Sequence, residues 1–474
     1  MTSENLIIIV ADTMRHLDIL AGDRPAELQR VMPTLSRMVR DGVSLQDMWA
    51  SSSWTAPSFL SLLSGFRPWR LHTELANSKD VAQELSVLPR AWRDLGGESL
   101  CLSANILISP TGGMINGFDA FNPGLLDLPM RTFRVGSAFL DSLRFPSGST
   151  RVKSRSASGV SAPVHGETAF LESVAQVYHR AGSGFTKGDR LRSSLSHFLR
   201  RREQERPLFL LVDLMEAHEP YLEDLNQRPI GMTGLSRATC NLCYYHRSHS
   251  IKNSDPPTFS DGYQHALRHL DSEVSQMLTI LSDSGILSNS TVILTSDHGQ
   301  SLGEHGLFGH AAHLYDELVR VPCVIWKGKD ASPLRHASAI QIPRFDHTHL
   351  HRALCDLMRK DSDHDVINSL SEAISKEPLT GAFYNGWRPL RKGSAPFGPP
   401  RSVIRLAEGS ESVFLELEHH GVVPVEGRVD NPAQGKLYKL AEEFLVKDSL
   451  ALRKSGNIPI DAGVDDRLKS WGYA

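Results

Sequence analysis

The residues with the clearest chemical potential are Asp297 and His298, which stand side by side where an apolar run ends. That run, residues 291–295, is rich in aliphatic and β-branched side chains and predicts a strand buried on both faces. A carboxylate and an imidazole at a strand end can both face one cation, and Gly299 lets the chain turn away sharply. His310 follows after a glycine-punctuated loop. An Asp-His pair is common by chance, so its meaning depends on how the other strands end.

Three more predicted strands have polar side chains at their ends. Asp12 follows the continuously apolar residues 5–11, Asn105 ends a shorter strand, and His218 lies just beyond the apolar run 207–215. In open α/β sheets the loops at the carboxyl ends of the strands form the site, so we expect these side chains to lie close together. Each has an ordinary alternative when taken alone, because an aspartate after a strand is often a turn or cap residue.

A candidate nucleophile precedes a predicted helix in residues 51–65. Thr55 is expected as the N-cap, Pro57 falls in the first turn, and Gly65 ends the helix. A hydroxyl in this position commonly serves only as a cap. The free N–H groups and the helix dipole at the same place would also stabilise an anionic group that the hydroxyl attacks. Thr55 can therefore act as a nucleophile if a metal or a base activates it.

The combined donors at the strand ends are carboxylate oxygens and imidazole nitrogens. Such donors favour Ca²⁺, Mn²⁺, Mg²⁺ or Zn²⁺ over a thiolate-bound metal, and we expect one divalent ion. A separate group, Cys240, Cys243, His246 and His249, suggests zinc. These four residues lack the long spacer that lets a zinc finger fold around its ion, so we place the metal at the strand ends.

The chain as a whole has the composition of an ordinary globular protein. Its 474 residues are 40% hydrophobic and 22% charged, enough to bury a large core. The buried strands, alternating with helical segments, predict an α/β fold around a central, mostly parallel sheet. We expect a catalytic domain over residues 1–375, with 145–166 and 222–261 as mobile insertions, and a smaller C-terminal α+β region over 376–474.

Charge and cysteine content restrict the partners and the compartment. The formal net charge is -3 and the pI is near 6.7, which favours neither nucleic acid nor a membrane surface as a partner. Five scattered cysteines indicate a reducing compartment, and no apolar run is long enough to span a bilayer. We therefore expect a cytoplasmic protein that acts on a small molecule, with a homo-oligomer compatible with these features.

Four motifs follow one another between about residues 5 and 355. They are Ile-Ile-Val-Ala-Asp12-Thr-Met-Arg, Trp54-Thr55-Ala-Pro57-Ser58 with Leu-Leu-Ser-Gly65, His218-Glu-Pro-Tyr221, and Thr-Ser-Asp297-His298-Gly-Gln-Ser-Leu-Gly-Glu-His-Gly with Gly-His310. In this order they resemble the sulfatase family of the alkaline phosphatase superfamily. The resemblance implies an alkaline phosphatase-like sandwich with one metal at the carboxyl edge of its sheet, held by Asp12, Thr55, Asp297 and His298.

The same resemblance implies roles for the other polar residues. Thr55 matches the family's nucleophile, which attacks the transferred group. His218 and His310 match positions that contact this group or protonate the leaving oxygen. Thr13 and Asn105 match positions at which the family contacts its substrate.

Two departures from the sulfatase pattern change the expected reaction. True sulfatases carry Cys or Ser at the position of Thr55, matured to formylglycine, and Arg where this chain has Phe59. A threonine cannot become that aldehyde. Many sulfatases also carry Asp at the position of Thr13 and Asn at the position of His298. Thr13 and His298 instead resemble the residues of phosphonate monoester hydrolases and phosphodiesterases, in which threonine nucleophiles are familiar. The expected function is a metal-dependent hydrolase of phosphate or phosphonate esters, with sulfate esters as further substrates.

Two alternatives remain open at this point. A transferase would use the same residues but pass the phospho group to an alcohol in place of water. A catalytically silent, sulfatase-like binding protein would keep the fold and use the metal as a structural anchor. Retention of Asp12, Thr55, Asp297 and His298 together speaks against the silent protein.

Overall fold

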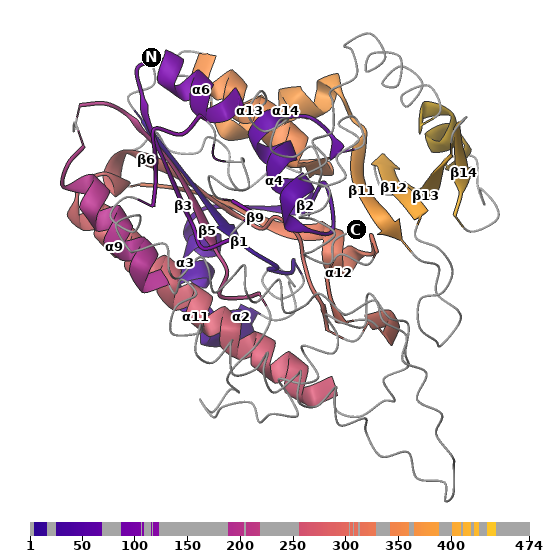
Figure 1. Ribbon diagram of the computed structural model, residues 1–474, viewed down its shortest axis with the longest axis horizontal. Coiled ribbons are helices and arrows are strands. Elements are labelled where there is room, and N and C mark those ends of the chain that lie inside the picture. The colour runs from indigo at the N-terminus through magenta and orange to yellow at the C-terminus, as the bar shows by residue number, and fades with distance from the viewer. Residues whose placement is uncertain are drawn as a thin grey trace, which may run out of the picture.

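The fold is seen in a computed structural model of the chain (Figure 1). The structure describes residues 4–16, 25–68, 87–105, 107–108, 115, 117–122, 188–202, 205–218, 256–302, 304–306, 308–310, 313–328, 342–359, 365–387, 401–408, 411–418, 421–425 and 434–441. The expected insertion 145–166 and the four possible zinc ligands between residues 240 and 249 lie outside these ranges.

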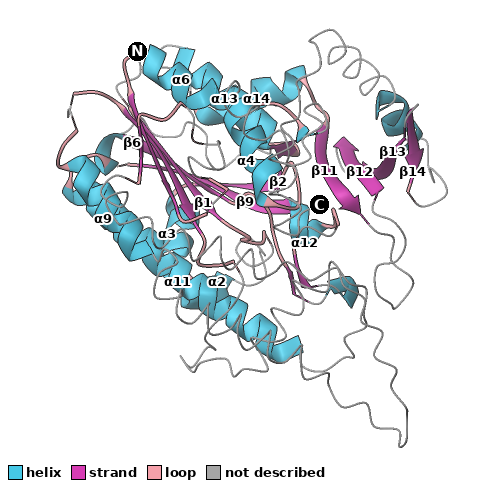
Figure 2. Ribbon diagram, viewed as in Figure 1, coloured by secondary structure: helices cyan, strands magenta, loops and turns pink. Residues whose placement is uncertain are grey.

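A mixed sheet of eight strands forms the centre of the molecule, in the order β10-β2-β9-β6-β1-β5-β3-β4 (Figures 1 and 2). The strands are β1 (Asn5–Ala11), β2 (Val43–Trp49), β3 (Glu98–Ser103), β4 (Ala120–Phe121), β5 (Leu208–Leu214), β6 (Ser290–Thr295), β9 (Arg320–Lys327) and β10 (Phe345–Asp346). The neighbouring pairs are parallel except the two that β9 makes with β2 and β6. The predicted α/β class and mostly parallel sheet are confirmed.

Helices cover both faces of this sheet, which is why its central strands are apolar throughout. One face packs on α4 (Thr55–Ser64), α6 (Val87–Asp94), α13 (His347–Arg359) and α14 (Val366–Lys376). The other packs on α2 (Pro25–Val31), α3 (Pro33–Asp41), α9 (Gly188–Leu199) and α11 (Pro256–Asp283). In β1, Ile8 and Val10 face the first group while Ile7 and Ile9 face the second, as the twofold alternation of a strand requires. Among the described residues, no helix is both long and apolar enough to cross a bilayer.

The long helix α11 corrects one sequence expectation. The irregular stretch was expected to extend to residue 261, but residues 256–261 belong to α11, which begins at Pro256. Proline suits the first turn of a helix because its missing N–H has no partner there. The rest of α11 follows the prediction, with Leu267, Leu270 and Val274 buried against the sheet.

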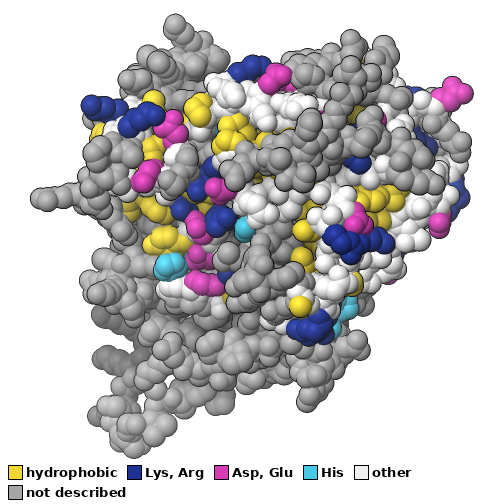
Figure 3. Space-filling model, turned by 180° about the vertical axis from the view of Figure 1, so that it is seen from behind, with side chains coloured by type: hydrophobic (Ala, Val, Ile, Leu, Met, Phe, Trp, Pro, Cys, Tyr) yellow, Lys and Arg dark blue, Asp and Glu magenta, His cyan; other side chains and the backbone are white. Residues whose placement is uncertain are grey.

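A second, antiparallel sheet follows α14 in the chain. Its strands are β11 (Thr380–Trp387), β12 (Arg401–Glu408), β13 (Glu411–Glu418) and β14 (Gly421–Pro424), and residues 434–441 form a helix over one face. The other face packs on Trp49 at the end of β2. This confirms the smaller α+β region that the sequence predicts. On the molecular face shown in Figure 3, acidic and basic side chains of the described residues are interspersed.

Buried charges join the second sheet to the first. Arg67, which is 1% exposed, lies 3.2 Å from the carboxylate of Asp346 and 2.9 Å from that of Glu377, and it also donates to the carbonyl oxygen of Leu379. Burial alone would raise the pKa of Asp346, but the Arg67 guanidinium and His349 hold that pKa well below its usual range. A buried cation with this many acceptors fixes the start of the second sheet against the end of α4.

Replacing Arg67 with methionine is expected to lower the free energy of unfolding by about 3–5 kcal/mol, because the fully buried Asp346 loses its guanidinium partner and Glu377 loses one of its two. Urea unfolding followed by circular dichroism measures this change. Lys436→Met is the control, since the Lys436 side chain is 64% exposed in its pair with Glu408 and its loss should change stability by less than about 1 kcal/mol. Equal effects of the two substitutions would contradict the role given to Arg67.

Candidate active site

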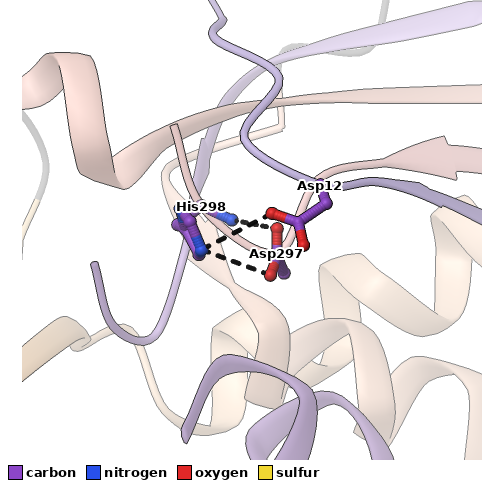
Figure 4. A group of neighbouring side chains, drawn as sticks. All are labelled: Asp12, Asp297 and His298. Carbon is purple, nitrogen blue, oxygen red and sulfur yellow. Dashed lines mark hydrogen bonds and ion pairs between the residues drawn. The ribbon is translucent and has the colours of Figure 1, made fainter. Parts of the chain in front are cut away.

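The candidate site lies at the carboxyl edge of two neighbouring parallel strands. Asp12 follows β1 directly, and Asp297 and His298 come two and three residues after the end of β6. Val10 and Ile293 face the helices that include α4, and the same alternation continued past each strand end directs Asp12 and Asp297 to that side. The three side chains are buried, and their ligand atoms all lie within 4.8 Å of one another. Figure 4 shows them pointing toward a common point.

The hydrogen bonds of His298 determine which ring nitrogen faces this point. Its Nδ1 lies 2.9 Å from the carbonyl oxygen of Gly299, which can only accept, so Nδ1 carries the proton. In the neutral imidazole, Nε2 then holds the lone pair. Nε2 lies 3.7 Å from Oδ1 of Asp12, 3.4 Å from Oδ2 of Asp297 and 3.4 Å from the hydroxyl oxygen of Thr55. A lone pair that faces two carboxylates is unfavourable unless a cation or a proton lies between them.

The electrostatics of Asp297 point to a cation. Burial raises the pKa of Asp297 to about 6, although the N–H groups of His298 and Thr13 partly oppose this shift. Those two donors bind its Oδ1, whereas its buried Oδ2 accepts no hydrogen bond within the described part of the chain. An orphaned buried carboxylate oxygen beside an imidazole lone pair fits a divalent metal, with oxygen and nitrogen donors as Mn²⁺, Zn²⁺ or a related ion accepts.

Thr55 reaches this group from the N-terminus of α4, but not as the predicted N-cap. Trp54 adopts the extended N-cap conformation, and Thr55 is the first helical residue. No side chain caps the helix at Trp54; the preceding loop is instead held by Ser58, whose hydroxyl accepts from the N–H of Ser52 and donates to its carbonyl. The N-cap prediction was therefore wrong in a way that matters for chemistry. The Thr55 hydroxyl has no capping role and faces His298 instead.

His218 and His310 lie on the same side of the site. The ring centroid of His310 is 4.7 Å from that of His298 and 4.8 Å from that of His218, so the three imidazoles form a continuous row. Nδ1 of His310 lies 3.3 Å from the side-chain oxygen of Gln300, which orients the ring. The structure thus brings His310 next to His298, and His218 next to His310.

Thr13 and Asn105 also lie at the site, in contact with the candidate ligands. The amide Nδ2 of Asn105 donates to Oδ2 of Asp12 at 3.2 Å. Thr13 has a positive φ of 63°, and its hydroxyl donates to the carbonyl of Ala217 at 2.7 Å, which ties the end of β1 to the loop carrying His218. Both residues therefore orient the site, and their contact with substrate stays a prediction.

The buried carboxyl group of Asp213, which was not expected to belong to the site, holds Asn105 in place through Ser103. Ser103 donates to Asp213 at 2.6 Å and accepts from the N–H of Asn105 at 2.9 Å. Burial raises the pKa of Asp213 well above its usual range, which the Ser103 hydroxyl opposes in part. The chain of contacts from Asp213 through Ser103 and Asn105 ends at Asp12. The only sequence signal for it was that Asp213, like Asp12, lies at the end of an apolar run.

Comparisons with known proteins give the family. The model of the Sulfatase family matches residues 4–359. The curated arylsulfatase of Clostridium perfringens (strain 13 / Type A) is 27% identical over 219 residues, which are 42% of this chain and 43% of that protein. Iduronate 2-sulfatase of Mus musculus is 32% identical over 84 residues, which are 18% of this chain and 15% of that protein. The aligned part is less than half the length of each of these relatives.

Solved structures share the fold over nearly the whole chain. The phosphonate monoester hydrolase of Agrobacterium radiobacter superposes with a TM-score of 0.52 at 14% identity, covering 94% of this chain and 96% of the other. The 2-O GAG sulfatase BT1596 gives a TM-score of 0.54 at 13% identity, covering 97% and 96%. The family match, the shared fold and the grouping of Asp12, Asp297 and His298 at one sheet edge lead to one conclusion: this chain belongs to the sulfatase family.

Proposed function

We propose that this protein is a metal-dependent hydrolase of phosphate or phosphonate esters with Thr55 as its nucleophile. The observation that carries the proposal is the Thr55 hydroxyl, which is free of any capping role and lies 3.4 Å from Nε2 of His298 within the Asp12, Asp297 and His298 group. A nucleophile beside a site for a divalent ion at a helix N-terminus is the arrangement that transfer of an anionic group requires.

In the first half of the proposed reaction, Thr55 attacks the ester. A divalent ion held by Asp12, Thr55, Asp297 and His298 would supply positive charge that lowers the pKa of the Thr55 hydroxyl and offsets charge on the ester. The Thr55 hydroxyl releases its proton to solvent, and the resulting oxygen anion attacks phosphorus in line, so the Oγ1–P bond forms as the bond to the leaving oxygen breaks. The N–H groups at the start of α4 face the anionic group during this step.

The second half of the reaction regenerates the enzyme. We assign His310 as the general acid, because Gln300 orients its ring, so it gives a proton to the leaving oxygen. Water then gives a proton to the neutral His310 and forms a bond to phosphorus while the threonyl ester bond breaks, so Thr55 leaves as the oxygen anion and His310 is protonated again. The result is a free alcohol and a free phosphate or phosphonate.

Intact-mass measurement on quenched reactions tests the proposal. The enzyme, supplied with Mn²⁺ or Ca²⁺, is mixed separately with an aryl phosphonate monoester, a phosphate diester and an aryl sulfate. A mass increase on the peptide that contains Thr55, together with a burst of aryl alcohol, is expected for the phosphorus esters. Turnover without an adduct on Thr55 under burst conditions would contradict the proposal, and an adduct only with the sulfate would reassign the transferred group. Added alcohols distinguish hydrolysis from transfer, since a transferase would form a new ester.

The loss of turnover on substitution of His310 with asparagine is expected to depend on the leaving group of the ester. Turnover of an alkyl ester should fall by about 10²–10⁴-fold, because its leaving oxygen needs a proton, whereas an ester of 4-nitrophenol should lose much less. Measuring kcat for a series of leaving groups gives the slope for each variant. The parallel variant His218→Asn is the comparison. A steeper slope for His218→Asn than for His310→Asn would move the general acid to His218.

A further inference from the structure

The nucleophile and the metal-binding residues come from strands that are not neighbours. Thr55 follows the end of β2 and Asp297 follows the end of β6, and β9 lies between these two strands in the sheet. Adjacent strands are about 4.8 Å apart, so the two segments leave the sheet roughly 10 Å from each other. No ladder hydrogen bond joins strands at that separation. Backbone bonds from Ala50 to Val319 and from Gly299 to Leu318 join each segment to the residues just before β9, and any direct link between the two segments must reach across β9.

His347 spans this gap with both nitrogens of one imidazole. Its Nδ1 accepts from the N–H of Ser51 at 3.2 Å, and its Nε2 lies 3.0 Å from the carbonyl oxygen of Ser296. A backbone N–H can only donate and a carbonyl can only accept, so the neutral ring with the proton on Nε2 satisfies both contacts. Ser51 is four residues before Thr55, and Ser296 directly precedes Asp297.

The surroundings of His347 keep the ring in place. The side chain is fully buried, and burial lowers its pKa to about 4, so it is neutral at pH 7. Its backbone neighbour Asp346 pairs with Trp49 at the end of β2 and is held by the Arg67 guanidinium. The imidazole is thus carried by a segment whose register with β2 is fixed independently of the active site.

We infer that His347 is a positioning residue that sets the distance between the nucleophile Thr55 and the metal-binding residues Asp297 and His298. The kinetic part of this inference rests on the function proposed above. The metal-binding part does not, because the same imidazole holds the segment that carries Asp297 whether or not an ester is turned over.

Three variants of His347 test whether its two hydrogen bonds act together as a bridge or contribute independently. His347→Asn keeps an acceptor near the position of Nδ1, His347→Gln keeps a donor near the position of Nε2, and His347→Leu keeps neither. Each half-bridge removes the direct link between the two segments and leaves the indirect one through the backbone of residues 317–319. Mn²⁺ affinity, followed by the electron paramagnetic resonance signal of the free ion, should therefore fall by a similar factor of about 10–100 in all three variants. The unfolding midpoint should fall least in the Asn and Gln variants and most in the Leu variant.

His351 in the same helix provides the matched control. It is also buried, and its Nδ1 bonds the carbonyl of Leu62 in α4 at 2.8 Å, far along that helix from Thr55. His351→Leu should lower the unfolding midpoint but leave Mn²⁺ affinity and kcat unchanged. A loss of Mn²⁺ affinity that tracks the loss of stability across all four variants would overturn the inference, as would half-bridge variants with wild-type affinity.

The same measurements distinguish failure of the role given to His347 from failure of the proposed function. If the wild-type protein binds Mn²⁺ but turns over none of the esters, the proposed function fails while the Mn²⁺ measurements still decide the role of His347. If ester turnover is found, kcat should fall with Mn²⁺ affinity in the three His347 variants while KM at saturating Mn²⁺ changes little. A wild-type protein that binds none of Mn²⁺, Mg²⁺, Ca²⁺ and Zn²⁺ would overturn both.

Discussion

Thr55→Ala is expected to reduce ester turnover by on the order of 10⁴–10⁶-fold, the loss typical of an enzyme without its nucleophile. The Thr55 hydroxyl makes no capping hydrogen bond, and alanine is a good helix former, so α4 should remain intact. The decrease should appear in kcat, with the aryl alcohol burst abolished. Stopped-flow measurement of the burst, with Mn²⁺ present, checks this result.

The control for this substitution is a hydroxyl in the same helix. Ser61 is buried and donates only to the carbonyl of Pro57 one turn earlier, so Ser61→Ala should keep kcat near the wild-type value. Thr55→Ser retains the oxygen without the methyl group and should keep a burst. Wild-type turnover in Thr55→Ala would remove Thr55 as the nucleophile and leave direct attack by water as the reaction.

The parts of the site that lie at strand ends could be predicted from the sequence. Residues 5–11 form β1 as expected, because a continuous apolar run bounded by polar residues is a local signal. The proximity of Asp12, Asp297 and His298 then followed from a general rule, because the carboxyl ends of parallel strands lie at one edge of a sheet. These predictions needed the direction of each strand but no detail of side-chain packing.

The residues that connect the site could not be predicted, because their contacts join segments far apart in the chain. His347 reaches Ser51 across 296 positions, and only the folded sheet brings the two together. The alternation of histidines at 347, 349 and 351 was the available signal, but all three bond backbone groups, which periodicity does not reveal. Strand β2 is interrupted by the polar Gln46 and Asp47 and so lacks the apolar run that marks β1.

The second large effect concerns Asp297→Asn, for which metal affinity and metal-free stability should change in opposite directions. In the metal-free protein, burial raises the pKa of Asp297 from 3.8 to about 6, so the folded state binds the proton more tightly than the unfolded state. The contribution of Asp297 to stability is therefore greatest at low pH and decreases as pH rises from about 4 to 6. By pH 7 the ionised carboxylate has removed about 3 kcal/mol of folding free energy.

Asparagine removes this charge and keeps the two backbone hydrogen bonds to the carboxylate. Its Oδ1 can still accept from the N–H groups of His298 and Thr13, and its amide replaces the orphaned Oδ2 with a donor facing the His298 lone pair. With EDTA at pH 7, the variant should be more stable than the wild type by up to about 3 kcal/mol, and this difference should disappear as pH falls from about 6 to 4. Its Mn²⁺ affinity should fall by at least about 100-fold, because a charged ligand is lost.

A second buried aspartate tests whether a gain in metal-free stability together with a loss of Mn²⁺ affinity is specific to the candidate site. Asp271 in α11 accepts from the N–H of Leu35 at one carboxylate oxygen and from that of Thr34 at the other, and burial raises its pKa as well. An amide can accept at only one of these places, so Asp271→Asn should destabilise the protein and leave Mn²⁺ affinity unchanged. Urea unfolding with EDTA and Mn²⁺ titration measure both quantities. If Asp297→Asn instead lowered metal-free stability and kept Mn²⁺ affinity, Asp297 would be a structural carboxylate and the cation would bind elsewhere.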